Sequence, residues 1–260
     1  MIHISTVIQT FLKRQQGQQF IAFVFFGVCL ALGMFLLHLA PSSATIGSPF
    51  TPKVHPLPSS LAQWSDPEAS GDYFEEIERT PAGYLVWSRF PVRVYLEPVR
   101  EKGDERGNQW MEAIHQAMRE WGEYLPLVEV EKPDQADIVW LRSRPPIRPT
   151  LDRDNRRLII PHSRNAEASY EFDFQDNTLI HRFTIQLTPH QSPHLTLGTA
   201  RHELGHALGI WGHSPLEGDA LYSTQVRTPP PISPRDVNTL KKIYQQPTLL
   251  GWRMEQLQSN

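Results

Sequence analysis

Apolar positions along the second half of this 260-residue chain follow two different spacings. Val92, Val94 and Leu96 recur at every second position, which predicts a half-buried strand. Residues 108–125 instead carry large apolar side chains every three or four positions, which predicts an amphipathic helix with its apolar side against a sheet. Those helix positions are Trp110, Ile114, Met118, Trp121 and Leu125.

Further segments continue this succession of strands and helices. Residues 127–130 and 136–143 are predicted strands, and residues 168–189 form a predicted hairpin around the turn sequence QDNT. Near the carboxyl end, the segment SPRDVNTLKKIY begins with Ser233 as a helix cap and has Asp236 three residues later. The apolar stripe that follows predicts a closing helix.

A long apolar run precedes these elements. Residues 20–40 contain no Asp, Glu, Lys or Arg, and as a helix they would span about 31 Å, which is enough to cross a bilayer. Lys13 and Arg14 precede the run, whereas the first acidic residue is Asp66, so the positive-inside rule predicts that the bulk of the chain lies outside the cytoplasm. Residues 41–82 are rich in Pro and Ser at their start and are predicted to form a stalk.

Two interpretations of the apolar run stay open. The run is longer than the core of a usual signal peptide, which favours an uncleaved single-pass membrane anchor. A cleavable signal peptide is the alternative, because Ser42 and Ala44 offer a small-residue pattern for cleavage. Both interpretations export the rest of the chain. The predicted organisation is a cytoplasmic tail (1–19), a transmembrane anchor or signal segment (20–40), a stalk (41–82), a folded domain (83–250) and a carboxyl-terminal tail (251–260).

Charge and cysteine content restrict the possible partners. A formal net charge of -3 gives no basic excess, so the sequence argues against a nucleic-acid partner. The only cysteine, Cys29, lies in the apolar run, so the remaining chain has no thiol for a disulfide or a metal site. Any metal must be bound through nitrogen and oxygen. Nothing in the sequence indicates an oligomeric state.

The candidate chemistry lies in the sequence HELGH, where His202, Glu203 and His206 fill the pattern H-E-x-x-H. On a helix, residues four apart lie on one side, so both imidazoles can bind one Zn²⁺. Glu203 is better placed to act as a general base, which takes a proton from a zinc-bound water and passes it to a leaving amine. Two helix histidines with ordinary hydrogen bonds are the alternative reading of this motif taken alone.

The residues that follow supply a third ligand. Gly209 is placed to end the helix in a left-handed turn, and Gly212 permits another unusual backbone angle, so the chain can return His213 to the metal. From His202 to His213 the chain resembles the metzincin metallopeptidases, and HELGHALG followed by HS is similar to the matrixins, the matrix metalloproteinase group. The consensus of that family is HExxHxxGxxH followed by a methionine turn beneath the metal.

The chain departs from this consensus at two positions. Three residues, rather than two, separate Gly209 from His213, so Gly212 occupies the usual ligand position and cannot ligate. The interval from His213 to Leu221 and Tyr222 matches the family interval to its methionine-tyrosine pair, which favours an insertion ahead of His213. The second departure is Leu221, which stands where methionine is expected and lacks the thioether sulfur.

The resemblance implies an α+β fold, with a twisted mixed sheet packed on an active-site helix and a second long helix. It also implies a zinc endopeptidase that cleaves extended polypeptides, which the predicted export of the chain would place outside the cytoplasm. An edge strand near residues 168–174 is suited to pair with the substrate backbone. Tyr222 is a candidate for the wall of a side-chain pocket. The cysteine that silences matrixins has no counterpart, because Cys29 lies in the apolar run.

A different class of function stays open as well. A metzincin-like binding or scaffolding domain, which retains zinc but is catalytically weakened, agrees with the inserted residue and with Leu221. The remaining histidines are interpreted as scattered loop and strand residues rather than a second zinc site, and they include His162, His181, His190 and His194.

Overall fold

The computed structural model describes residues 50–147, 149–152, 157–159 and 164–258. Contacts divide the chain into Met1–Ser48 and Pro49–Asn260, and every described residue belongs to the second unit. The predicted membrane segment at residues 20–40 therefore lies outside the described residues. Within the described part, no helix is both long and apolar enough to cross a membrane.

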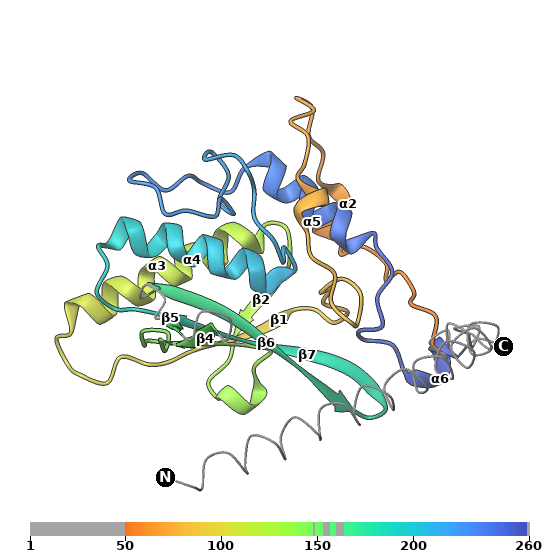
Figure 1. Cartoon of the computed structure of the whole chain (residues 1–260), viewed down its shortest axis with the longest axis horizontal. Helices are drawn as coiled ribbons and strands as arrows, with labels where there is room; N and C mark the ends of the chain where they lie inside the picture. Colours follow the sequence, from red (N-terminus) through yellow and green to blue (C-terminus); the bar gives the residue numbers. More distant parts are fainter. Residues whose placement is uncertain (1–49, 148, 153–156, 160–163, 259–260) are drawn as a thin grey trace, which may run out of the picture. The chain divides into compact units, whose positions relative to one another are not determined.

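A mixed five-stranded sheet forms one layer of the domain (Figure 1). Its order is β2 (Leu127–Glu129), β1 (Val92–Leu96), β3 (Ile138–Leu141), β7 (Thr178–Leu187) and β6 (Ala166–Gln175). The pairs β2–β1, β1–β3 and β3–β7 are parallel, whereas the edge strand β6 pairs antiparallel with β7. The predicted hairpin is confirmed, and its turn lies at Asp176 and Asn177, which both adopt positive φ. A separate antiparallel ladder joins β4 (Thr150–Asp152) to β5 (Arg157–Ile159).

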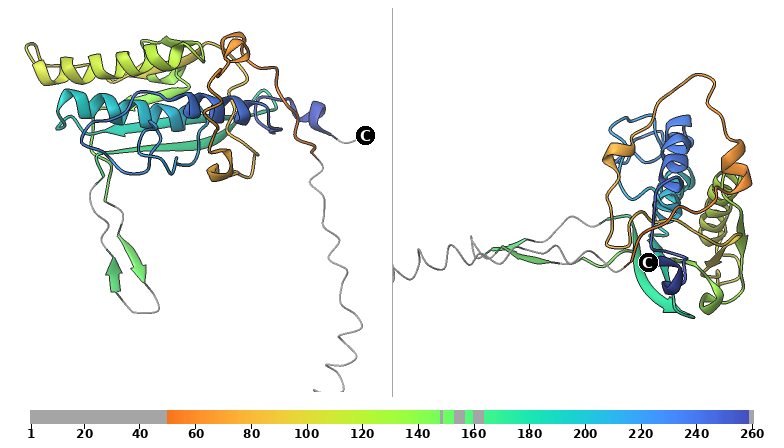
Figure 2. Two further views of the ribbon diagram at one scale, coloured as in Figure 1. Left: turned by 90° about the horizontal axis from the view of Figure 1, so that it is seen from above. Right: turned by 90° about the vertical axis from the view of Figure 1, so that its right-hand side faces the viewer.

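Two long helices, α3 (Glu105–Gly122) and α4 (Pro193–Leu208), lie side by side over one face of the sheet (Figure 1 and Figure 2). α3 is capped by Asp104, whose carboxylate accepts the Gly107 N–H at 2.8 Å. Its predicted apolar stripe is buried throughout. Trp121 Nε1 on α3 donates to the Arg201 carbonyl on α4 at 2.9 Å, which joins the two helices directly.

The closing helix is α5 (Pro234–Tyr244), and it begins where the sequence predicts. Ser233 accepts the Asp236 N–H and Asp236 accepts the Ser233 N–H, so the two residues form a capping box. The shorter helical elements are α2 (Ser59–Gln63), η2 (Phe74–Glu76), η3 (Pro133–Gln135) and α6 (Met254–Leu257). The strands β1, β2 and β3, the β6–β7 hairpin and the helices α3 and α5 thus follow the local sequence patterns, whereas the β4–β5 ladder lies in a segment for which the sequence predicts a loop.

The prediction of a stalk is wrong for the described part of residues 41–82. Leu61 is completely buried, and Tyr73 and Ile77 are nearly so. Ser60 Oγ donates to the Tyr124 carbonyl at 2.7 Å, beyond the end of α3. Isolated apolar and aromatic side chains between the prolines fix this segment to the domain, so its lack of periodicity did not mean a lack of burial.

The predicted carboxyl-terminal tail at residues 251–260 is also part of the domain up to its last described residues. Leu257 on α6 is completely buried, and its carbonyl accepts the Thr51 N–H at 2.7 Å. The two ends of the described chain therefore pair with each other. The folded domain extends over residues 50–258 rather than over 83–250.

Candidate metal centre

His202 and His206 lie one turn apart on α4, and their Nε2 atoms are 3.0 Å from each other. His202 Nδ1 lies 3.0 Å from the Ala220 carbonyl, and His206 Nδ1 lies 2.7 Å from the Ile210 carbonyl. Because a carbonyl can only accept, Nδ1 carries the hydrogen in each ring. Both Nε2 lone pairs are therefore free to bind a cation.

His213 joins this pair from the turn that follows α4. Gly209 ends the helix with φ of 129°, a conformation that favours glycine, and the chain then reverses. The His213 ring centroid lies 5.2 Å from that of His202 and 4.9 Å from that of His206. One ligand nitrogen from each histidine lies within 4.8 Å of the others. Among the described residues, no other group of His, Cys, Asp and Glu is compact enough to hold a metal ion.

Burial favours the neutral form of these imidazoles. It lowers the pKa of His202 to about 4, and it lowers the pKa of His206 well below its usual value. The pKa of His213 is also lowered, mainly by partial burial. Neutral imidazoles are the form that binds metals, and three nitrogen ligands fit a transition-metal ion better than Mg²⁺ or Ca²⁺, which prefer oxygen.

Glu203 is 8% exposed and lies between α4 and the edge strand β6. Burial raises the pKa of its carboxyl to about 7, although a hydrogen bond from the Ala168 N–H opposes that shift. A cation beside the carboxyl would lower this pKa again.

Leu221 packs against α4 beside Gly205. Its side chain is completely buried. A Cβ at Gly205, between the two helix histidines, would lie 2.6 Å from Leu221 Cδ2 and 3.0 Å from Trp121 Cζ2. The glycine therefore lets Leu221 and Trp121 approach the backbone of α4 closely.

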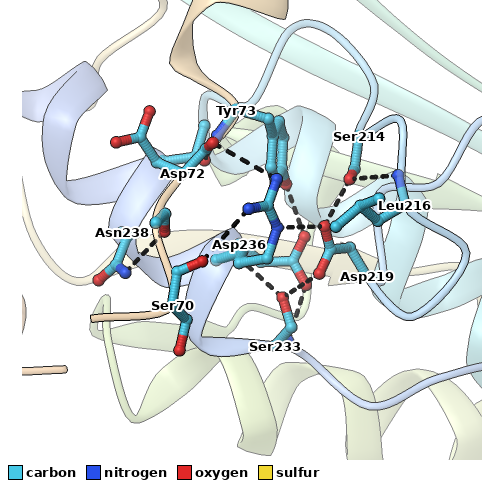
Figure 3. Close-up of polar contacts among 12 residues, drawn as sticks. Ser70, Asp72, Tyr73, Ser214, Leu216, Asp219, Ser233, Asp236 and Asn238 are labelled. Carbon is cyan, nitrogen blue, oxygen red and sulfur yellow. Dashed lines mark hydrogen bonds and ion pairs between the residues drawn. The ribbon is translucent and has the colours of Figure 1, made fainter. Parts of the chain in front are cut away.

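The buried carboxylate of Asp236 on α5 (Figure 3) holds the segment that orients His202. Asp236 is completely buried and accepts hydrogen bonds from Tyr73 Oη at 2.6 Å, the Ala220 N–H at 2.9 Å and the Ser233 N–H at 2.7 Å. The carbonyl of the same Ala220 accepts from His202. Asp236 is consequently connected to a candidate ligand through one residue.

A second buried aspartate, Asp219, fixes the loop that follows His213. Asp219 is 3% exposed and accepts from Ser233 Oγ at 2.7 Å and from Arg235 Nε at 3.0 Å. It also accepts from Ser214 Oγ, next to the candidate ligand His213 (Figure 3). The loop between His213 and Leu221 is therefore fixed to the start of α5.

The three histidines and Glu203 line a cavity of about 600 Å³. Residues Ala166 to Ala168 of β6 form one side, so the free edge of the sheet runs beside the candidate metal centre. Tyr222 lines the same cavity, as does Trp211, whose ring lies 4.9 Å from that of Tyr170 on β6. All five residues selected from the sequence thus meet at one site.

Several lining and supporting residues were missed from the sequence. Glu78 lines the cavity beside His213, but it belongs to the segment that was predicted to be a stalk. Arg164 also lines it and carries no motif. The sequence signal for Asp236 was its position three residues after Ser233, which identified it as a capping residue and nothing more.

The remaining described histidines lie elsewhere. His181 on β7 is buried, stacks on Trp87 with ring centroids 3.9 Å apart, and has its pKa lowered by burial to about 3. His190 and His194 are exposed around the start of α4. His162 lies outside the described residues.

Comparison with known proteins provides no independent assignment. No protein-family model matches this chain, and no curated protein matches it. The functional argument therefore depends on the geometry of the site.

Proposed function

We propose that this protein is a zinc-dependent endopeptidase with a metzincin-like domain. The observation that carries the proposal is the convergence of His202, His206 and His213 at a cavity that also contains the buried Glu203. Three histidines leave a coordination position open, which is typical of catalytic zinc sites, whereas structural sites are usually closed by four protein ligands. The arrangement is therefore better suited to a reaction than to structural support.

The fold supports the same proposal at a coarser level. The resemblance noted in the sequence implies a mixed sheet on two long helices, and the observed sheet has four parallel strands and one antiparallel edge strand. The edge strand β6 lies next to the candidate centre, and its outer side has no neighbour within the sheet. An extended polypeptide can pair with such an edge through backbone hydrogen bonds, which makes a polypeptide the proposed substrate.

The residues of the site have separate roles in this proposal. Bound Zn²⁺ supplies Lewis acidity, which polarises a peptide carbonyl and makes water more acidic. Glu203 takes a proton from the attacking water and delivers it to the nitrogen of the peptide bond that breaks. β6 holds the substrate backbone so that the carbonyl lies near Glu203, and Tyr222 forms part of the wall against a substrate side chain.

Substitution of the proposed base tests this assignment. Glu203→Gln retains an oxygen that can accept the Ala168 N–H, so the variant should fold and bind zinc. Its peptide turnover should fall at least about 100-fold, because general-base catalysis contributes about 10²- to 10⁴-fold. Glu217→Gln is a matched control in an exposed position outside the cavity, and it should turn over normally.

Zinc content and cleavage of a denatured-protein or peptide library decide between enzyme and binding domain. Unimpaired cleavage by Glu203→Gln would mean that another group is the base. Zinc binding without cleavage by the unaltered protein, even at high protein concentration, would favour the weakened binding or scaffolding domain instead.

The proposal places this activity outside the cytoplasm. It rests on the apolar residues 20–40 and on the basic Lys13 and Arg14 that precede them. In intact cells, externally added protease should digest the folded domain if the segment is an uncleaved anchor. Full protection, with no release of the domain into the medium, would contradict export.

A further inference from the structure

His213 is held differently from the other two candidate ligands. His202 and His206 are each oriented by a hydrogen bond from Nδ1 to a backbone carbonyl. Within the described part of the chain, the His213 ring has ring contacts with both histidines but no hydrogen-bond partner. Metal-binding histidines are usually oriented through their second nitrogen, so the direction of the His213 ring depends on the backbone that carries it.

The backbone of this turn is fixed on both sides of His213. After it, the Ser214 N–H donates to the Leu221 carbonyl at 2.9 Å. Before it, the Glu78 N–H donates to the Trp211 carbonyl at 2.9 Å, and Ile77 pairs with Gly212 as an antiparallel bridge. The second anchor comes from the segment that was expected to be a stalk, more than 130 residues earlier in the chain.

Residues 73–78, named here the amino-terminal arm, are themselves well fixed. Ile77 is 8% exposed, and the Tyr73 N–H donates to Thr239 Oγ1 on α5 at 3.0 Å. Tyr73 Oη donates to the buried Asp236 at 2.6 Å. The amino-terminal arm therefore connects α5 to the turn that carries His213, and it can transmit the position of the helix to that turn.

Gly212 is one of the three residues that separate Gly209 from His213, and its lack of a side chain lets the amino-terminal arm approach. A Cβ on Gly212 would collide with the Glu76 carbonyl oxygen and would lie 3.1 Å from Ile77 Cα. Its neighbours here are backbone atoms, which cannot move aside as the end of a flexible side chain can. A side chain at this position would force the turn and the amino-terminal arm apart.

We propose that the amino-terminal arm is a positioning element for the third metal ligand, with the backbone contact between Glu78 and Trp211 and the side-chain-free Gly212 as its essential parts. This inference rests on the proposed zinc site. It also accounts for the inserted residue, since the longer turn provides the backbone surface on which the arm pairs.

Two variants break this contact from opposite sides. Gly212→Ala adds a methyl group in the turn, whereas Glu78→Pro removes the donor in the arm without adding an atom to the turn. Ile77 already has φ of -90° and ψ of 122°, which the residue before a proline can adopt. Each variant should weaken zinc binding by about 10- to 100-fold, the usual effect of losing a group that orients a ligand.

Matched controls separate positioning from other effects. Gly218→Ala changes a glycine in the same loop whose added Cβ would have nothing within 4 Å, so zinc affinity should stay the same. Glu78→Ala removes the carboxylate but keeps the N–H. The ratio of the dissociation constants of Glu78→Pro and Glu78→Ala therefore measures the backbone hydrogen bond alone.

Zinc affinity is measured by competition with a chromophoric chelator, and the visible spectrum of the Co²⁺-substituted protein reports the ligand set. In Gly212→Ala and Glu78→Pro the Co²⁺ bands should shift toward those of His213→Ala. Circular dichroism of the metal-free forms identifies the variants that fold. If Gly212→Ala does not fold, the zinc affinity of Glu78→Pro tests the role of the amino-terminal arm.

The outcomes distinguish this inference from the proposed function. Wild-type zinc affinity and Co²⁺ spectra in folded Glu78→Pro would overturn the role of the arm while leaving the zinc site intact. An equal loss in Glu78→Ala and Glu78→Pro would also overturn it, because the carboxylate would then be responsible. Failure of the unaltered protein to bind zinc would overturn both proposals together.

Discussion

Asp236 offers the strongest test of how the closing helix supports the candidate centre. Its carboxylate is completely buried and accepts from three donors, on Tyr73, Ala220 and Ser233. Asp236→Ala leaves all three without a partner. Each lost hydrogen bond of this kind costs about 1–3 kcal/mol. Burial raises the pKa of the Asp236 carboxyl, which means that its charge is unfavourable there, so removal of the charge offsets part of the total. We expect a net loss of about 3–5 kcal/mol in the free energy of unfolding.

Two milder substitutions isolate the cause of that loss. In Asp236→Asn the side-chain oxygen can still accept from Ala220 and Ser233, and the amide can donate to the Tyr73 hydroxyl. Tyr73→Phe removes only one of the three donors. Both should cost no more than about 2 kcal/mol, since either one hydrogen bond or only the charge is lost. Thermal and urea unfolding of the metal-free proteins measure these differences.

The consequence for the metal centre follows from Ala220. Its N–H is held by Asp236 and its carbonyl orients His202, so Asp236→Ala should also weaken zinc binding at least about 10-fold. Tyr73→Phe leaves the bond to Ala220 in place and should bind zinc within about threefold of the wild type. The measurement belongs at a temperature where circular dichroism shows both variants folded. Wild-type zinc affinity in folded Asp236→Ala would refute the connection between α5 and His202.

Three further predictions concern single side chains. Leu221→Met changes a completely buried side chain to one of similar volume, so thermal unfolding should show a loss of less than about 1.5 kcal/mol in the free energy of unfolding. A larger loss would mean that the space around Leu221 fits only leucine. His213→Ala should reduce zinc affinity far more than His194→Ala, and equal chelator-competition results would mean that His213 is not the third ligand. The buried His181 has a folded-state pKa of about 3, below the usual 6.5, so its stabilising effect is complete above about pH 6.5 and is lost as the pH falls toward 3. Between pH 7 and pH 5, metal-free His181→Phe should therefore lose about 2 kcal/mol less stability than the wild type in urea titrations, and parallel losses would contradict this assignment.

Much of the fold between residues 92 and 244 could be predicted because each element has its own local pattern. The buried positions Val92, Val94 and Leu96 recur with the period of a strand, and the stripe from Trp110 to Leu125 follows that of a helix. The capping box at Ser233 and Asp236 was equally visible, since both partners lie within four residues. The pairing order of the strands was not predicted, because the spacing of apolar residues does not fix it.

The amino-terminal segment could not be predicted in this way. Its burial depends on single contacts with distant residues, such as Trp64 Nε1 donating to Asn238 Oδ1 at 2.9 Å and Lys241 Nζ donating to the Trp64 carbonyl at 2.7 Å. Prolines between Leu57 and Ser70 break any helical or strand period, so no periodic signal was left. A segment can lack secondary structure and still be an integral part of the core.

The two departures from the family pattern lie at different places in the candidate site, so they should affect different measurable properties. Leu221 lies against α4 at Gly205, so its effect is on the packing of that helix between His202 and His206. The longer turn, which contains Gly212, instead changes how His213 is attached, because it lies against the amino-terminal arm. Poorer packing of Leu221 against α4 would lower the free energy of unfolding of the domain, whereas poorer packing of the turn against the amino-terminal arm would lower zinc affinity. Comparison of these two quantities in Leu221→Met and Gly212→Ala therefore separates the departures, although both lie within a few residues of the same ligand.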